Sequence, residues 1–285
     1  MDYKKFETFK FWFIYDRLDH WKIIEKETST VIGDVSKSGT ILFYSDIENT
    51  SILNDDKYID ADWEAYQARP EYLIGQHVEI SGKDSDFAKE CYSNLISSLI
   101  MCRAYKNKQN PDDHIDYIEK VVSWIASTDF YDMPASTRYH ESFKHGLLYH
   151  TIAVYNNMLE LIQIPKFKSV DIDSATLCCL VHDWCKIGLY ESYKRNVKNE
   201  ETGKWEQVDS YRRKSFPHPF GHGASSMYMA MKLFRLTEEE ALAIRWHMSM
   251  FNVASNEINE YQQSCEEYPL VHLLQFSDQL SITNY

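Results

Sequence analysis

The spacing of the apolar positions changes near residue 84, and this change divides the chain into two kinds of sequence. Before it, short aromatic and β-branched runs alternate with turn residues, which is typical of strands joined by short loops. After it, apolar residues recur at every third or fourth position, which is typical of amphipathic helices. The pattern predicts a mainly α protein, with a smaller α+β or β-rich module over residues 1–82 and a helical domain over residues 83–285.

The N-terminal module contains three segments that we expect to be strands. They are residues 9–15, 40–44 and 77–80. Turns are predicted where Gly, Ser, Asn and Asp gather, because these residues readily adopt the backbone angles of tight turns. They lie at Gly33, at residues 37–39 and at residues 54–56. The residues of this module indicate no function.

Capping residues mark where some of the later helices begin. Asp173 is the expected N-cap of a helix that ends at His182 and Asp183, since a carboxylate can accept hydrogen bonds from the first backbone N–H groups. Thr237 followed by Glu240 has the spacing of a capping box. Other helices are predicted to begin at residues 84 and 111 and to cover residues 146–164 and 258–280, the last with a break near Pro269.

The helical pattern stops between Lys194 and Pro217. Residues 198–208 predict a β-hairpin with Thr202 and Gly203 at its tip, and so a hairpin insertion near residues 196–214. Residues 194–214 hold seven Lys and Arg against four Asp and Glu, a local charge of +3. Two interpretations stay open, a solvated hairpin or a basic rim that steers an anionic substrate.

The composition narrows the classes of protein to which the chain could belong. The 285 residues carry 30 Lys and Arg against 43 Asp and Glu, a net charge of −13, which opposes non-specific attraction to nucleic acid. The longest early apolar run, residues 11–15, is too short to span a membrane, and no signal peptide is evident. The six cysteines lack a zinc-type spacing. We therefore expect a cytoplasmic protein with reduced thiols and no membrane partner.

Six residues of the types that bind metal ions lie in separate segments of the helical part. They are His150, His182, Asp183, His222, His247 and Asp278. The adjacent pair His182 and Asp183 lies in the apolar run 175–186, where burying a charge is costly unless an ion compensates it. Imidazoles combined with carboxylates suit Mn, Fe, Co, Ni or Zn, and the carboxylates also admit Mg. The set favours metal-assisted hydrolysis.

Several segments that hold these residues resemble the successive motifs of the HD-domain metal-dependent phosphohydrolases. The closest resemblance is to bacterial and phage HD hydrolases related to the OB–HD type of 3′–5′ exonuclease, and it covers about residues 130–280. The segments are Tyr139-His-Glu-Ser-Phe-Lys-His-Gly-Leu-Leu-Tyr-His-Thr151, Leu180-Val-His-Asp-Trp-Cys-Lys-Ile-Gly188, Pro219-Phe-Gly-His-Gly223, Ile244-Arg-Trp-His-Met248 and Phe276-Ser-Asp-Gln279.

The resemblance implies an all-helical catalytic core that holds one or two metal ions. The expected ligands of the first ion are His150, His182, Asp183 and Asp278. His222 and His247 match the additional ligands of members with two ions, in which the aspartate of the adjacent pair bridges both. This chain departs from similar proteins at His145, where they have glycine, and at Tyr149, where they have an acid.

Other residues are candidates for contact with the substrate. Lys186 follows His182 by four positions, so it would lie on the same side of a continuing helix and could contact a phosphate, or it could simply complement the helix dipole. Asp183 and Lys186 are the catalytic candidates. The candidate substrate contacts are His140, His145, Lys186, Tyr190, Lys194, Arg195, Arg212 and Arg213.

The sequence leaves three functions open. The favoured one is a metal-dependent phosphohydrolase or phosphodiesterase that cleaves a phosphoester of a nucleotide, or of a small nucleotide-like anion, with metal-activated water. The second is a 3′–5′ exonuclease on single-stranded nucleic acid, which should carry a basic groove with stacking aromatic residues. The third is a non-catalytic, metal-stabilised regulator. Neither the exact substrate nor the oligomeric state follows from the sequence.

Overall fold

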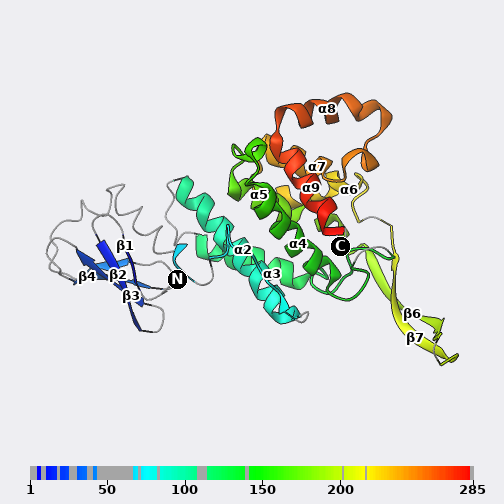
Figure 1. Cartoon of the computed structure of the whole chain (residues 1–285), viewed down its shortest axis with the longest axis horizontal. Helices are drawn as coiled ribbons and strands as arrows, with labels where there is room; N and C mark the ends of the chain where they lie inside the picture. Colours follow the sequence, from blue (N-terminus) through cyan, green and yellow to red (C-terminus); the bar gives the residue numbers. More distant parts are fainter. Residues whose placement is uncertain are drawn as a thin grey trace. The chain divides into compact units, whose positions relative to one another are not determined.

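The computed structural model describes twelve stretches of the chain (Figure 1). They are residues 5–7, 11–17, 20–25, 31–36, 41–43, 67–69, 72–81, 84–107, 114–138, 141–200, 202–215 and 217–282. The described part is mostly helical, which confirms the mainly α class. The chain divides into two compact units, residues 1–73 with 100–119, and residues 74–99 with 120–285. The boundary expected at residue 82 stays a prediction.

The first unit contains an antiparallel sheet in which each strand pairs with the next along the chain. Its strands are β1 (Lys5–Glu7), β2 (Phe11–Arg17), β3 (His20–Glu25), β4 (Val31–Ser36) and β5 (Ile41–Phe43). β2 and β5 overlap the strands expected at residues 9–15 and 40–44. The turn expected at Gly33 is wrong, because Gly33 lies inside β4 and pairs with Ile23 and Phe43. The turns expected at residues 37–39 and 54–56 lie outside the described residues.

The strand expected over residues 77–80 is not formed. The backbone of Val78 bonds instead to one side chain, since its N–H donates to Oδ1 of Asn156 at 3.0 Å and its carbonyl accepts from Nδ2 of Asn156 at 2.9 Å. An asparagine on a helix therefore satisfies the groups that a neighbouring strand would otherwise satisfy. The apolar residues of this segment are better explained by contact with that helix than by a sheet.

The helices form the bulk of the described chain (Figure 1). They are α2 (Ser85–Lys106), α3 (Ile115–Ser127), α4 (Gly146–Leu161), α5 (Ile172–Val181), α6 (His222–Met231), α7 (Glu238–Trp246), α8 (Ile258–Glu267) and α9 (Pro269–Ile282). In the second unit α4 packs on α5 and α9, and α7 packs on α6 and α9. Among the described residues, none of the helices combines the length and the apolar character that crossing a membrane requires.

The helix ends follow the capping signals with one correction. Thr237 and Glu240 form the predicted capping box at the start of α7. The N-cap of α5 is Asp171 and not Asp173, since Oδ1 of Asp171 accepts from the backbone N–H groups of Asp173 and Ser174 at 3.0 and 3.1 Å. Both aspartates have the right chemistry, so the sequence alone could not choose between them.

A buried aromatic cluster fixes the turn that follows α5. The hydroxyl of Tyr92 donates to the carbonyl of Leu180 at 2.8 Å and accepts from the indole N–H of Trp184 at 3.0 Å. The rings of Trp124 and Trp184 lie 5.1 Å apart. Because Trp184 is fully buried and bonded, the short 3₁₀ turn η5 (Trp184–Lys186) is held in one position. This turn directly follows His182 and Asp183.

The hairpin is longer than the sequence indicated. β6 (Tyr190–Lys198) pairs with β7 (Trp205–Arg213) in an unbroken antiparallel register, from Tyr190 opposite Arg213 to Lys198 opposite Trp205. Gly203 has a φ of 68° near the tip, a conformation that glycine adopts without strain. The hairpin projects from the helices, and most of its residues are exposed (Figure 1).

Candidate metal centre

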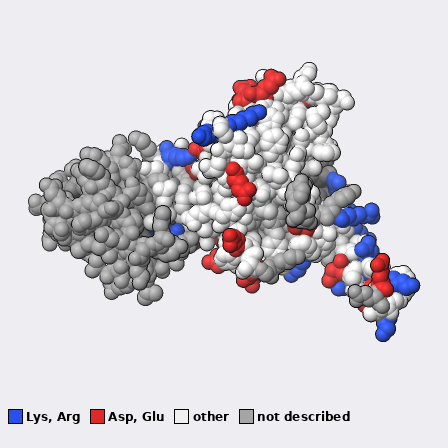
Figure 2. Space-filling model, in the orientation of Figure 1, with Lys and Arg blue, Asp and Glu red and all other residues white. Residues whose placement is uncertain are grey.

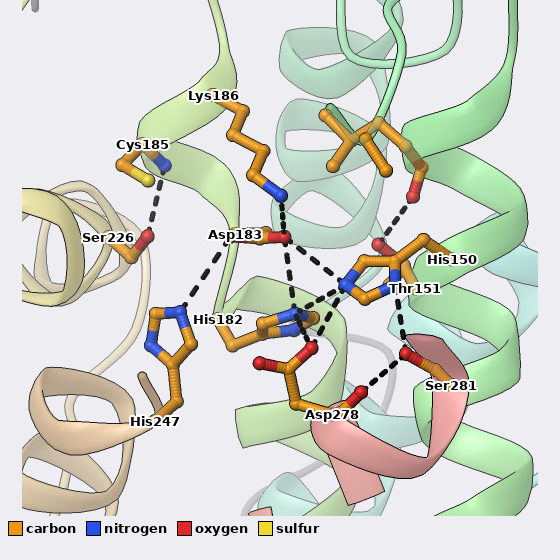
Figure 3. A network of polar contacts seen from close by, with 12 residues as sticks. His150, Thr151, His182, Asp183, Cys185, Lys186, Ser226, His247, Asp278 and Ser281 are labelled. Atoms are coloured by element: carbon orange, nitrogen blue, oxygen red, sulfur yellow. Dashed lines mark hydrogen bonds and ion pairs between the residues drawn. The ribbon is translucent and has the colours of Figure 1, made fainter. Parts of the chain in front are cut away.

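The six residues proposed as metal ligands converge in the second unit, although they come from different helices or helix ends. Figure 3 labels all of them except His222. His150 lies in α4 and Asp278 in α9, while His222 is the first residue of α6. His182 and His247 are the C-cap residues of α5 and α7. Chain segments separated by more than a hundred residues thus meet at one point.

Asp183 lies at the middle of the centre, and its two oxygens face different groups. Oδ1 lies 2.8 Å from Nε2 of His222 and 3.7 Å from Nε2 of His247. Oδ2 lies 3.3 Å from Nε2 of His150 and 3.4 Å from Nε2 of His182. The carboxylate therefore divides the histidines into two pairs, one on each oxygen.

Asp278 adds a second carboxylate beside one of these pairs. Its Oδ1 lies 3.2 Å from Nε2 of His150 and 3.9 Å from Nε2 of His182. The two imidazole nitrogens themselves are 3.2 Å apart. His150, His182 and Asp183 offer ligand atoms that all lie within 4.8 Å of one another. Together with His222, these residues could hold a metal ion.

Hydrogen bonds on the far side of three imidazole rings fix how these rings are oriented. Nδ1 of His182 donates to the carbonyl of Cys179 at 2.8 Å, and Nδ1 of His247 donates to the carbonyl of Ile244 at 2.7 Å. In the neutral tautomer that these two bonds favour, the ring nitrogen that faces the centre is an unprotonated Nε2, which is the form that binds a metal ion. This arrangement is typical of histidine ligands, whose other nitrogen is held by an outer partner.

Ser281 orients the third ring. Its hydroxyl donates to the carbonyl of Asp278 at 2.6 Å, so its oxygen is left to accept from Nδ1 of His150 at 3.0 Å. The sequence analysis did not single out Ser281. Its signal is the spacing from Asp278, since residues three positions apart lie on the same side of a helix.

The buried charges balance one another without an ion. Burial lowers the pKa of His150, but hydrogen bonds to Asp183 and Asp278 outweigh burial and raise it to about 9. Burial also lowers the pKa of Lys186, and the charge of Asp183 reverses this and raises it. An imidazolium and an ammonium thus face the two carboxylates. Binding a cation would displace the proton of His150, as metal ions commonly do.

The pKa values of Asp183 and His222 are also shifted by burial and by the neighbouring charges. Burial raises the pKa of Asp183, but the charges of Lys186 and His182 and the histidine contacts outweigh it, so this carboxyl is ionised. The pKa of His222 falls to about 4, chiefly because of burial and against the opposing effect of Asp183. His222 is therefore neutral, and its Nε2–H donates to Asp183.

Nε2 of His247 is the atom of the centre that most directly indicates cation binding. It is buried and has no hydrogen-bond partner among the described residues, and its lone pair faces Oδ1 of Asp183 at 3.7 Å. A buried lone pair beside a carboxylate oxygen is unfavourable. A cation between the two atoms would satisfy both. The donor set therefore fits a divalent metal ion.

Lys186 reaches the centre by a different route from the one expected. The helix does not continue past Val181, so the same-side argument from His182 is wrong. The 3₁₀ turn η5 brings Lys186 back instead, and its Nζ lies 2.6 Å from Oδ2 of Asp183. Lys186 is only 7% exposed. Its ammonium therefore belongs to the centre.

Two of the candidate substrate contacts, His140 and His145, precede α4 in the sequence. His140 lies outside the described residues. His145 has a left-handed backbone with φ 69°, and its Nδ1 donates to the carbonyl of Tyr131 at 2.6 Å. In the described part of the chain, no hydrogen bond or ion pair joins His145 to the centre. Its role in substrate contact stays a prediction.

The candidate contacts on the hairpin are spread along it. Tyr190 is buried at the base, and its hydroxyl donates to the carbonyl of Ala135 at 3.4 Å. Lys194 forms an ion pair with Asp209 at 2.7 Å. The remaining candidates Arg195, Arg212 and Arg213 line a single pocket. The structure thus brings three of them together.

Cys185 is a possible ligand that the sequence analysis did not consider. It forms a second set with Asp183 and His222 whose ligand atoms lie within 4.8 Å of one another. Burial raises the pKa of its thiol to about 12, and the charge of Asp183 contributes to this rise. A thiol must lose its proton to bind a metal, so Cys185 is a weaker donor here than the histidines.

Comparison of the chain with protein-family models, with curated proteins and with solved structures gave no match.

Proposed function

We propose that this protein is a metal-dependent phosphohydrolase that cleaves a phosphoester of a nucleotide or of a small nucleotide-like anion. The observation that carries the proposal is the position of Asp183, whose two oxygens each face a separate pair of histidines. A carboxylate in this position can bridge two divalent ions. The resemblance of the motifs to HD-domain phosphohydrolases supports the same assignment.

The residues of the centre suit this chemistry. Bound divalent ions would activate water at neutral pH and neutralise charge on the phosphate. Four neutral imidazoles and two carboxylates can hold two such ions and leave the centre with an excess of positive charge, which favours an anionic substrate. The buried ammonium of Lys186 adds to that excess and lies within reach of a phosphate bound beside Asp183.

A panel assay tests the proposal. The full-length protein is stripped with a chelator, reloaded with Mn, Mg, Co or Ni, and assayed on nucleoside mono- and triphosphates, cyclic dinucleotides and single-stranded oligonucleotides. We expect hydrolysis that the chelator abolishes and one of the metals restores, with about two ions bound per chain. A protein that binds no metal, or that hydrolyses substrates equally well after stripping, would contradict the proposal.

Replacing Lys186 by methionine should lower kcat about 100-fold and leave the metal content unchanged. Methionine fills a similar buried volume but removes the charge that would contact the phosphate, and removing one such stabilising group costs a factor of this order. The matched control is Lys214→Met, since Lys214 is exposed and is not among the candidate contacts. If Lys186→Met loses its metal instead, Lys186 is a structural partner of Asp183.

A further inference from the structure

A pocket lined by arginines lies where the hairpin meets the loop after α3. It has a volume of about 630 Å³, within the range of pockets that bind small molecules. We call it the arginine pocket. Its walls include Arg138 and Ser142 from the loop and Tyr193, Arg195, Arg212 and Arg213 from the two strands.

The pocket has a strong excess of positive charge, in contrast to the chain as a whole. Four arginines are among its lining residues, with Arg195 and Arg212 on one face of the two-stranded ribbon and Arg213 on the other. Asp209, the carboxylate among the described lining residues, is paired with Lys194 at 2.7 Å. Arg212 donates to Oε1 of Glu191 at 2.5 Å. No hydrogen bond or ion pair within the described residues engages the guanidinium group of Arg138 or of Arg195. Figure 2 shows Lys and Arg side chains along the projecting hairpin, with a few carboxylates among them.

Tyr190, at the start of the hairpin, links one end of the pocket to the metal centre electrostatically. Arg213 lies opposite Tyr190 in the strand register, and Tyr190 follows Lys186 by four residues. Burial raises the pKa of the Tyr190 phenol, and the charges of Lys186, Asp183 and Arg213 act on it as well. Tyr190 therefore lies within electrostatic reach of the centre and of the arginine at the base of the pocket.

The pocket is longer than one phosphate requires. Arg195 pairs with Val208, five residues along β7 from Arg213. At about 3.3 Å per residue, this separation is roughly 17 Å. Tyr193 and Tyr211 are also among the lining residues, on opposite faces of the ribbon, and a tyrosine ring on either face can stack on a nucleobase. The size and the side chains therefore fit a phosphate attached to a nucleoside.

We propose that the arginine pocket binds the second phosphate of a substrate, so that the substrate is a nucleotide carrying at least two phosphate groups. The inference rests on the proposed function for the reaction, because the metal centre would cleave one phosphoester while the pocket holds the other phosphate. Guanidinium groups suit this role, since each can donate two parallel hydrogen bonds to phosphate oxygens.

Binding to the full-length protein after chelator treatment tests the inference without any turnover. Isothermal titration uses inorganic phosphate, pyrophosphate, adenosine monophosphate and adenosine diphosphate as probes. We expect the diphosphate nucleotide to bind most tightly. The double variant Arg138→Ala with Arg195→Ala should bind it about 100-fold more weakly, at about tenfold for each lost charged contact. Lys204→Ala is the matched control, since Lys204 is exposed on the same hairpin and outside the pocket wall.

The outcomes separate this inference from the proposed function. The inference would be overturned if the double variant bound adenosine diphosphate as tightly as the unchanged protein does. It would also be overturned if Lys204→Ala weakened this binding as much as the double variant does. Pyrophosphate binding as tightly as the diphosphate nucleotide would overturn the nucleotide part. Arginine-dependent binding in a protein that hydrolyses none of the panel would uphold the pocket and overturn the proposed reaction.

Discussion

Replacing Asp183 by alanine is expected to remove the metal and to lower hydrolysis at least about 1,000-fold. The side chain is almost completely buried, and its two oxygens contact four histidines and Lys186. A single substitution therefore removes the group that joins the two halves of the centre. We expect the helical fold to persist, since the aromatic contacts of Trp184 and Tyr92 still hold the turn after α5.

Three measurements on this variant separate a lost ligand from a lost fold. Metal content is measured by mass spectrometry, turnover by the panel assay, and helix content by circular dichroism. Asp183→Asn keeps the shape and removes the charge, so it should show the same loss of metal. The control Asp173→Asn changes another buried aspartate, in the helix α5 that precedes Asp183, and should keep both metal and turnover. Retained turnover in Asp183→Ala would refute the role assigned to this residue.

The sequence predicted the features of the fold that depend on local chemistry. The capping box at Thr237 was found because both of its hydrogen bonds are made between residues three positions apart. The break at Pro269 separates α8 from α9, as a residue without a backbone N–H requires. The turn predicted at Gly33 from its neighbouring residues is wrong, because the position of Gly33 in a strand depends on pairing with β3 and β5, whose residues are distant in the sequence.

The convergence of the six ligand candidates could be expected only from a resemblance of motifs, because helix packing brings them together. Their residue types indicated a metal, whereas the division of the histidines between the oxygens of Asp183 needed coordinates. Lys186 shows where prediction from sequence spacing fails. Spacing from His182 suggested a continuing helix, but burial of Trp184 against Tyr92 and Trp124 turns the chain after Asp183. Tertiary packing thus decides a geometry that a local pattern cannot.

Gly223→Ala should destabilise the protein by about 3 kcal/mol and deplete the metal, although Gly223 itself offers no ligand. A Cβ at this position would lie 2.0 Å from the carbonyl oxygen of Arg245 and 2.7 Å from its carbonyl carbon. Both atoms belong to the backbone of α7, so a side-chain rotation cannot relieve the clash. The helix α6 would have to move away from α7.

This movement would separate one pair of histidines. His222 precedes Gly223 at the start of α6, His247 ends α7, and their rings lie 5.1 Å apart. We therefore expect one of two ions to be lost first, with a melting temperature lower by about 10 °C. Gly203→Ala is the control, because nothing lies within 4 Å of its added Cβ and only local backbone strain results. Full metal content in Gly223→Ala would show that the close contact of α6 with α7 does not position His222.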